Sequence, residues 1–207
     1  MVVVGVVRAV DLRAAVLGDE RRQSLIEACA RVLAREGAGG TSVRTIAVEA
    51  GVSAGLVGHY FGGIDALIEA TYGHVEEQVA LAIDAAVAAA GPDPRLRLEA
   101  FATASFRAPI ADPALLATWI AFWSLVRARP GIASLHAQQY AAFRRRLEAL
   151  LGQCGVAPVQ QRSAAIGITA LIDGLWLELC LSPKTFGADE AARIVRAALD
   201  RITSTDQ

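Results

Sequence analysis

The stretch SVRTIAVEAGVSAGLVGHYF, residues 42–61, has the layout of two short helices joined by a sharp turn. A first helix is predicted over residues 43–50, and Gly51 breaks it. Ser53 is predicted to cap a second helix that runs to about Tyr60. Two short helices joined at a glycine are typical of a helix-turn-helix, in which the turn sets the second helix across the first.

This stretch carries no net charge, because Arg44 is its only cation and Glu49 cancels it. The whole chain has 20 Lys and Arg residues against 21 Asp and Glu residues, a formal net charge of −1, and Lys184 is its only lysine. No global basic field therefore points to nucleic acid, and any DNA-binding surface must be local. Hydroxyl groups and helix N-termini can hold phosphates without lysine, so DNA binding stays compatible with this charge.

The 207 residues predict an all-α protein, because hydrophobic residues make up 54% of the chain, aromatic residues only 6%, and there are just seven prolines. Three regions are expected: an N-terminal extension over 1–19, a three-helix helix-turn-helix head over 20–65, and a larger helical body over 66–207. The head is expected to begin with a helix that Gly37 ends. Glycine and proline separators place the remaining helices at about 64–90, 95–108, 112–128, 131–152, 158–181 and 188–203.

The extension over residues 1–19 is apolar but is interrupted by Arg8, Asp11 and Arg13. It is too short and too charged to span a membrane and lacks the basic start of a signal peptide. We expect a poorly ordered or loosely docked extension, with an arm that reaches toward DNA as the alternative. The three cysteines, Cys29, Cys154 and Cys180, are scattered without metal-binding spacing, which favours a reducing cytoplasm and predicts neither a disulfide framework nor a metal site.

Residues 21–71 resemble the N-terminal domain of the TetR family of transcriptional repressors. The matching pieces are IEACARVLAREG, TSVRTIAVEAGVSAGLVGHYF and ALIEA. The resemblance implies a DNA-binding domain of three helices, whose second short helix is the recognition helix. Together with the residues expected on the exposed face, it gives these candidate DNA contacts: Thr41, Ser42, Arg44, Ser53, Ala54, Gly55, Val57, Gly58, His59 and Tyr60.

The sequence departs from the family at Ile64, where members usually carry a lysine that meets a phosphate. The absence of this lysine should lower the affinity for DNA. It should also reduce by about one unit the slope of the logarithm of the binding constant against the logarithm of the salt concentration. The small residues Ala54, Gly55 and Gly58 offer few hydrogen bonds to base edges. Shape and methyl contacts are therefore expected to share the recognition of the operator.

The body contains two distinctive segments, WIAFW within 119–123 and LIDGLW within 171–176. They resemble the C-terminal domain of the BetI-type branch, the choline-responsive repressors. This resemblance implies a homodimer that binds a palindromic operator in double-stranded DNA and takes a small-molecule inducer. No cofactor is expected, and no membrane attachment, because Asp173 and Glu178 interrupt the apolar run. The face formed by Ile194, Val195, Ala198, Leu199 and Ile202, together with helix 158–181, is predicted to form the dimer.

Choline cannot donate a hydrogen bond from its quaternary ammonium group, so proteins hold this group with aromatic faces and a nearby carboxylate. The aromatic residues could equally be part of the core, and Asp173 could instead be a buried hydrogen-bonding residue. Glu178 is the alternative to Asp173 as the counter-charge. The candidate ligand-binding residues are Trp119, Phe122, Trp123, Tyr140, Asp173 and Trp176.

Other functions stay open. A regulator of the same family could respond to an unrelated apolar or cationic ligand, and a helical scaffold could bind protein and no DNA. Catalysis is not expected, because His59, His74 and His136 share no triad or metal spacing and no catalytic residues can be assigned. The segment HVEE, residues 74–77, is predicted to be a solvated helix face.

Overall fold

The computed structural model describes the backbone of residues 3–204 and the side chains of residues 17–204. All regular structure in this range is helical, as the composition predicts. The head contains α1 (Val3–Gly40), α2 (Val43–Ala50) and α3 (Gly55–Phe61). The body contains α4 (Ile64–Ala89), α5 (Pro94–Thr103), the 3-10 turn η1 (Ala104–Phe106), α6 (Pro113–Val126), α7 (Pro130–Gln153), α8 (Pro158–Leu181) and α9 (Ala188–Thr203).

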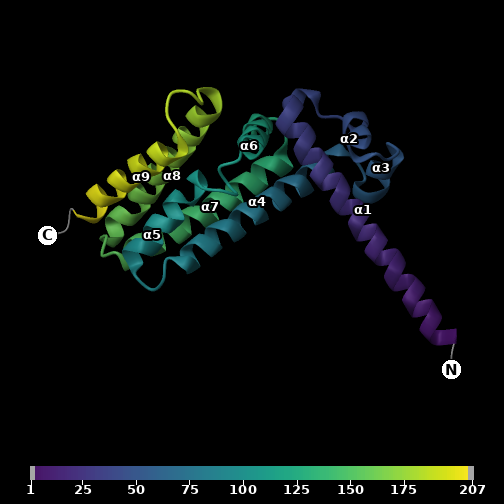
Figure 1. Cartoon of the computed structure of the whole chain (residues 1–207), viewed down its shortest axis with the longest axis horizontal. Helices are drawn as coiled ribbons and strands as arrows, with labels where there is room; N and C mark the ends of the chain where they lie inside the picture. Colours follow the sequence, from purple (N-terminus) through teal and green to yellow (C-terminus); the bar gives the residue numbers. More distant parts are fainter. Residues whose placement is uncertain (1–2, 205–207) are drawn as a thin grey trace.

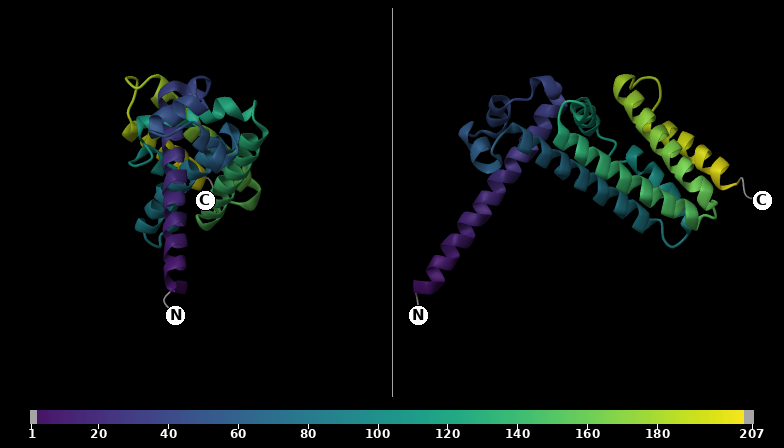
Figure 2. Two further views of the ribbon diagram at one scale, coloured as in Figure 1. Left: turned by 90° about the vertical axis from the view of Figure 1, so that its right-hand side faces the viewer. Right: turned by 180° about the vertical axis from the view of Figure 1, so that it is seen from behind.

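Helix α1 is longer than predicted, because it begins at Val3 and not near residue 20. Its N-terminal part extends away from the rest of the molecule in every view (Figures 1 and 2). The side chains of residues 1–16, including Arg8 and Arg13, lie outside the description, so their role as an arm that reaches DNA stays a prediction. Gly37 interrupts the helix at the predicted place with a φ of 67° and a ψ of −175°, but the chain remains helical to Gly40.

The head is a three-helix unit held by one apolar cluster. Ile46 and Val57 are fully buried against α1 and α4, together with Leu25 and Cys29 of α1 and Leu67 of α4. Helix α4 contacts α1 and α3 at its N-terminal end and packs against α5 and α7 along the body. The predicted boundary at residues 65 and 66 falls within the first turn of this helix, which therefore belongs to both regions.

The body helices pack side by side, with α8 and α9 at the end that lies far from the head (Figure 1). Proline stands at the first positions of α5, α6, α7 and α8, and Asp93 and Asp112 accept hydrogen bonds from the backbone N–H groups that begin α5 and α6. Among the described residues, α8 is long and apolar enough to cross a membrane by length and composition, a property that core helices share. Only 28% of its apolar window is buried within one chain.

Candidate functional site

The helix-turn-helix is built by local hydrogen bonds that the sequence encodes. The backbone N–H of Thr45 donates to the Ser42 hydroxyl at 3.1 Å, and the N–H of Ser42 donates to the Thr45 hydroxyl at 2.9 Å, which forms a reciprocal cap on α2. Gly51 ends α2 with a φ of 65°, the left-handed conformation that glycine adopts without strain. These contacts set the direction of α3 relative to α2.

The start of α3 differs from the prediction. Its N-cap is Ala54 and not Ser53, and no side chain caps the helix. The helix begins one residue later than expected. Val57 is completely buried in the core, so its predicted role as an exposed DNA contact is wrong, while Leu56 is only partly buried.

The remaining candidate DNA contacts form a polar and small-residue surface over α2 and α3. Thr41 is buried, and its hydroxyl donates to the carbonyl oxygen of Gly37 at 2.7 Å, so this side chain stabilises the head from within. Ser42 and Tyr60 are partly buried, and the Tyr60 ring meets the His59 ring edge-on, with centroids 4.9 Å apart. The exposed members of the set are Arg44, Ser53, Ala54, Gly55, Gly58 and His59.

Glu49, whose charge balances that of Arg44 in the sequence, does not form an ion pair with Arg44 in the structure. Glu49 accepts hydrogen bonds from Arg31 at 2.7 Å and from Arg35 at 2.9 Å, and both arginines belong to α1. Hydrogen bonds from these arginines, Arg31 first, lower the pKa of Glu49. Arg44 is exposed and has no ion-pair partner among the described side chains, so its charge is available to a phosphate.

A second site lies in the body, where a cavity of about 140 Å³ opens between α4, α6, α7 and α8, with Ser105 of η1 at its wall. A cavity of roughly 150 Å³ can hold a molecule as large as benzene, so a small organic cation fits this space. Five of the six predicted ligand-binding residues line it: Trp119, Trp123, Tyr140, Asp173 and Trp176.

Phe122, the sixth predicted ligand-binding residue, is not in the cavity wall. Its ring is fully buried and packs against Tyr72 of α4 and against Trp119, with ring centroids 4.9 Å and 5.8 Å apart, respectively. The prediction that Phe122 contacts the ligand is therefore wrong. Its role is to hold Trp119 in place against α4.

Aromatic rings in the cavity are fixed by their neighbours. The indole N–H of Trp176 donates to the carbonyl oxygen of Ser105 at 2.8 Å, and the Trp119 and Trp176 rings lie 6.5 Å apart. The indole Nε1 of Trp119 is buried without a hydrogen-bond partner among the described residues. A ligand oxygen could accept a hydrogen bond from this N–H group, because buried polar groups are rarely left unpaired.

Asp173 provides a negative charge at the cavity wall. Its Oδ1 accepts a hydrogen bond from the Tyr140 hydroxyl at 3.1 Å. Burial raises the pKa of Asp173 from 3.8 to about 6, although the Tyr140 hydrogen bond and the charge of Arg144 act in the opposite direction. The ionised carboxylate is thus costly in this buried position, and a bound cation would offset that cost.

Glu76 is a cavity residue that the sequence did not identify. It was expected on the solvated face of residues 74–77, yet it lines the cavity from α4, and burial raises its pKa. The signal was its place on one helical stripe with Tyr72 and Ile83, both buried. Glu178, the proposed alternative to Asp173, is exposed on α8 and outside the cavity wall.

Comparison with known proteins gives matches to both the head and the body of the chain. Two family descriptions match the chain: the tetR family of bacterial regulatory proteins over residues 25–71, and the C-terminal domain of BetI-type transcriptional repressors over residues 94–204. The HTH-type transcriptional regulator BetI of Burkholderia thailandensis is 36% identical over 182 residues, which cover 87% of this chain and 92% of the relative.

Two solved structures share the fold. A transcriptional regulator from Pseudomonas aeruginosa is 39% identical and superimposes with a TM-score of 0.82, covering 90% of this chain and 92% of the other. A regulator from Saccharomonospora viridis, solved in complex with choline, is 21% identical with a TM-score of 0.73 and covers 91% and 97% of the two chains. At that identity, the second likeness concerns the fold alone.

Proposed function

The chain belongs to the TetR family of transcriptional regulators, with a C-terminal domain of the BetI type, and we propose that it is a repressor that a small organic cation releases from DNA. Its dimer would bind a palindromic operator in the cytoplasm. Choline or a related quaternary ammonium compound is the proposed inducer. The observation that carries this proposal is a cavity with aromatic walls and two carboxylates, built on helices that also contact the DNA-binding head.

Two helices connect the cavity to the head. Helix α4 lines the cavity with Glu76 and Ile83 and begins directly after α3, the recognition helix. Helix α6 contributes Trp119 and Trp123 to the cavity and packs against α1, and the Thr118 hydroxyl lies 3.4 Å from the carbonyl oxygen of Ala30 in α1. A ligand that displaces these helices would thereby move the head.

Whether the ligand releases the DNA depends on which conformation of the dimer it binds more tightly. Operator binding requires the two recognition helices of a dimer to lie about 34–36 Å apart, in successive major grooves. A ligand shifts this arrangement only if it binds better to the state in which the heads do not fit the operator. Couplings of about 1–3 kcal/mol are typical, which corresponds to an affinity change of roughly 5- to 150-fold.

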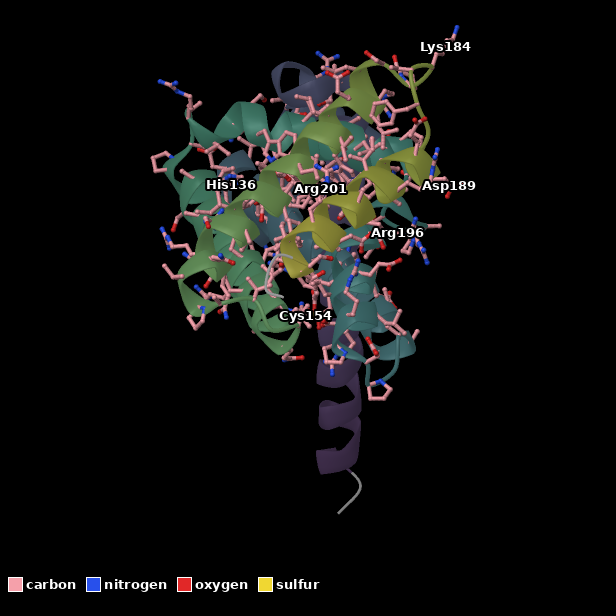
Figure 3. All side chains as sticks on the ribbon, turned by 90° about the vertical axis from the view of Figure 1, so that its left-hand side faces the viewer. His136, Cys154, Lys184, Asp189, Arg196 and Arg201 are labelled. Carbon is pink, nitrogen blue, oxygen red and sulfur yellow. The ribbon has the colours of Figure 1, made fainter. Side chains whose placement is uncertain are left out.

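The dimer would form through the face of α8 and α9 that lies nearest the viewer in Figure 3. Helix α8 exposes Ile166, Leu177 and Leu181, and Ile194 of α9 is 40% exposed. Val195 and Leu199, which were predicted on the dimer face, are fully buried within the chain and belong to its own core. The dimer surface is therefore proposed to rest more on α8 than the sequence pattern indicated.

Replacing Ile166 with arginine should produce monomers at micromolar concentration, because two buried charges would meet across the two-fold axis. Sedimentation velocity measures the change, and operator affinity should fall with it, since a palindrome requires two heads. The control is Leu81→Arg, which adds the same charge at an exposed apolar position of α4. A dimer that survives Ile166→Arg would place the interface elsewhere.

Choline binding should weaken as the pH falls from 7.5 to 5, by about tenfold, because Asp173 has its pKa raised to about 6 and loses its charge below that value. Binding weakens at low pH because choline keeps its positive charge at every pH and attracts only the ionised form of the carboxylate. Glu76 titrates in the same cavity, and His136, with its pKa lowered by burial and by the charge of Arg144, lies beside Tyr140. Titration calorimetry at several pH values measures this dependence. The variant Asp173→Asn should show a smaller dependence on pH. An unchanged pH profile in that variant would contradict the assignment of the titration to Asp173.

Operator binding is tested by fluorescence anisotropy of the purified protein on duplex DNA taken from the region upstream of its own gene. Random duplex of equal length is the control. We expect a preference of at least about 1,000-fold at physiological salt, the lower bound for specific recognition. Equal affinity for both duplexes at every salt concentration would instead favour a helical scaffold that does not recognise an operator.

A further inference from the structure

A second chamber adjoins the cavity on its outer side. It is an open groove of about 400 Å³ formed by α6, α7 and α8, and Leu177 at its wall also lies on the proposed dimer face, so the partner subunit would border it. Trp123, Tyr140 and Asp173 line both spaces, so these three side chains stand at the junction of the inner cavity and the outer chamber. A ligand larger than the inner cavity could thus occupy both.

The two spaces differ in charge. The inner cavity contains the carboxylates of Glu76 and Asp173, and the arginine at its wall, Arg146, is already paired with Asp84. The outer chamber adds the guanidinium group of Arg127 and the imidazole of His136 to the shared Asp173. A cation is therefore favoured inside, whereas Arg127 offsets the charge of Asp173 in the outer chamber, so an anion is repelled less there.

Arg127 is available to bind an anion. It follows the last residue of α6, is exposed, and has no carboxylate partner among the side chains that the structure describes. A guanidinium group can donate two parallel hydrogen bonds to a phosphate or a carboxylate. An unpaired arginine at the rim of a chamber is thus suited to an anionic group that enters from solvent.

His136 faces the same chamber from α7. Its ring lies 4.2 Å from the Tyr140 ring, and its Nδ1 lies 3.5 Å from the Tyr72 hydroxyl, which leaves Nε2 for another partner. Burial lowers the pKa of His136, and the positive charge of Arg144 lowers it further, so the ring is neutral at pH 7.5. A neutral imidazole still provides one N–H donor.

We infer that the natural ligand is a quaternary ammonium zwitterion whose ammonium group occupies the inner cavity and whose anionic group contacts Arg127 and His136 in the outer chamber. This inference rests on the proposed function, in which the cavity binds a quaternary ammonium group. We expect more than one carbon atom to be needed between the two charges, because Tyr140 and Asp173 stand between the spaces. With a single carbon, as in glycine betaine, the anion would remain beside Glu76 and Asp173 and be repelled.

The test is titration calorimetry of the full chain at pH 7.5 with choline, phosphocholine, carnitine and glycine betaine. Phosphocholine or carnitine should bind at least about fivefold more tightly than choline, a modest gain because Arg127 is exposed. Glycine betaine should bind more weakly than choline. The stronger of the two long zwitterions identifies the anion as phosphate or carboxylate.

Arg127→Gln should remove the advantage of the long zwitterions and leave choline binding unchanged, and Arg145→Gln, at an exposed position of α7 outside both spaces, should change neither. Choline that binds as tightly as both long zwitterions, or a zwitterion advantage that survives Arg127→Gln, would overturn the inference and leave the proposed function intact. Failure of all four compounds to bind would overturn both.

Discussion

Replacing Gly58 with glutamate is expected to weaken operator binding by more than about 100-fold while the helical fold stays intact. Gly58 is exposed on α3, and an added Cβ would meet no atom within 4 Å, so the larger side chain fits without strain. The new carboxylate would face the phosphates of the operator. Juxtaposed like charges cost several kcal/mol, and each 1.4 kcal/mol corresponds to about a tenfold change in affinity.

The matched control is Ala85→Glu, which places the same side chain at an exposed position of α4 away from the head. Anisotropy on operator duplex measures affinity, and circular dichroism measures helicity in both variants. Full operator binding by a folded Gly58→Glu protein would show that α3 does not enter the major groove.

Replacing Asp173 with asparagine is expected to weaken choline binding by about 10- to 100-fold and to leave operator affinity unchanged. Asparagine has the shape of aspartate, and its carbonyl oxygen can still accept from the Tyr140 hydroxyl, so the change removes mainly the negative charge. Close charge pairs in desolvated sites contribute at least about 1.5 kcal/mol to the binding free energy. The variant should therefore repress normally and respond poorly to inducer.

Thermal unfolding provides the check on folding for this variant. The charged form of Asp173 is disfavoured in the folded protein, as its raised pKa shows, so removing the charge at pH 7.5 should not lower the Tm of the ligand-free protein. The control is Glu178→Gln, which removes an exposed carboxylate from the same helix. Equal choline affinity in Asp173→Asn and the unaltered protein would exclude Asp173 as the counter-charge.

Much of the fold was predictable because glycine and proline mark the ends of its helices. The limits of α8 and α9 agree with the expected ranges, since Pro158 begins α8 and a Pro183-to-Gly187 loop separates the two. The start of α1 was not predictable from these signals. Arg8 and Asp11 interrupt the apolar pattern, but neither residue ends a helix, so the helix continues through them to Val3.

The errors at the two sites have a common physical cause. Helical spacing shows which residues share a face, but the neighbouring helices decide which face becomes core and which becomes cavity. Phe122 and Trp119 share a stripe, yet Phe122 packs against Tyr72 while Trp119 reaches the cavity. In the seven-residue α3, packing against α4 buries Val57, which the sequence pattern placed on the exposed face.

The most direct test of the central claim is a choline titration into the complex of the protein with its operator, followed by fluorescence anisotropy. We expect release of the DNA at choline concentrations that saturate the cavity in calorimetry, and no release in Asp173→Asn at those same concentrations. An operator complex that stays intact while calorimetry shows the cavity filled would contradict the coupling of the body to the head through α4 and α6.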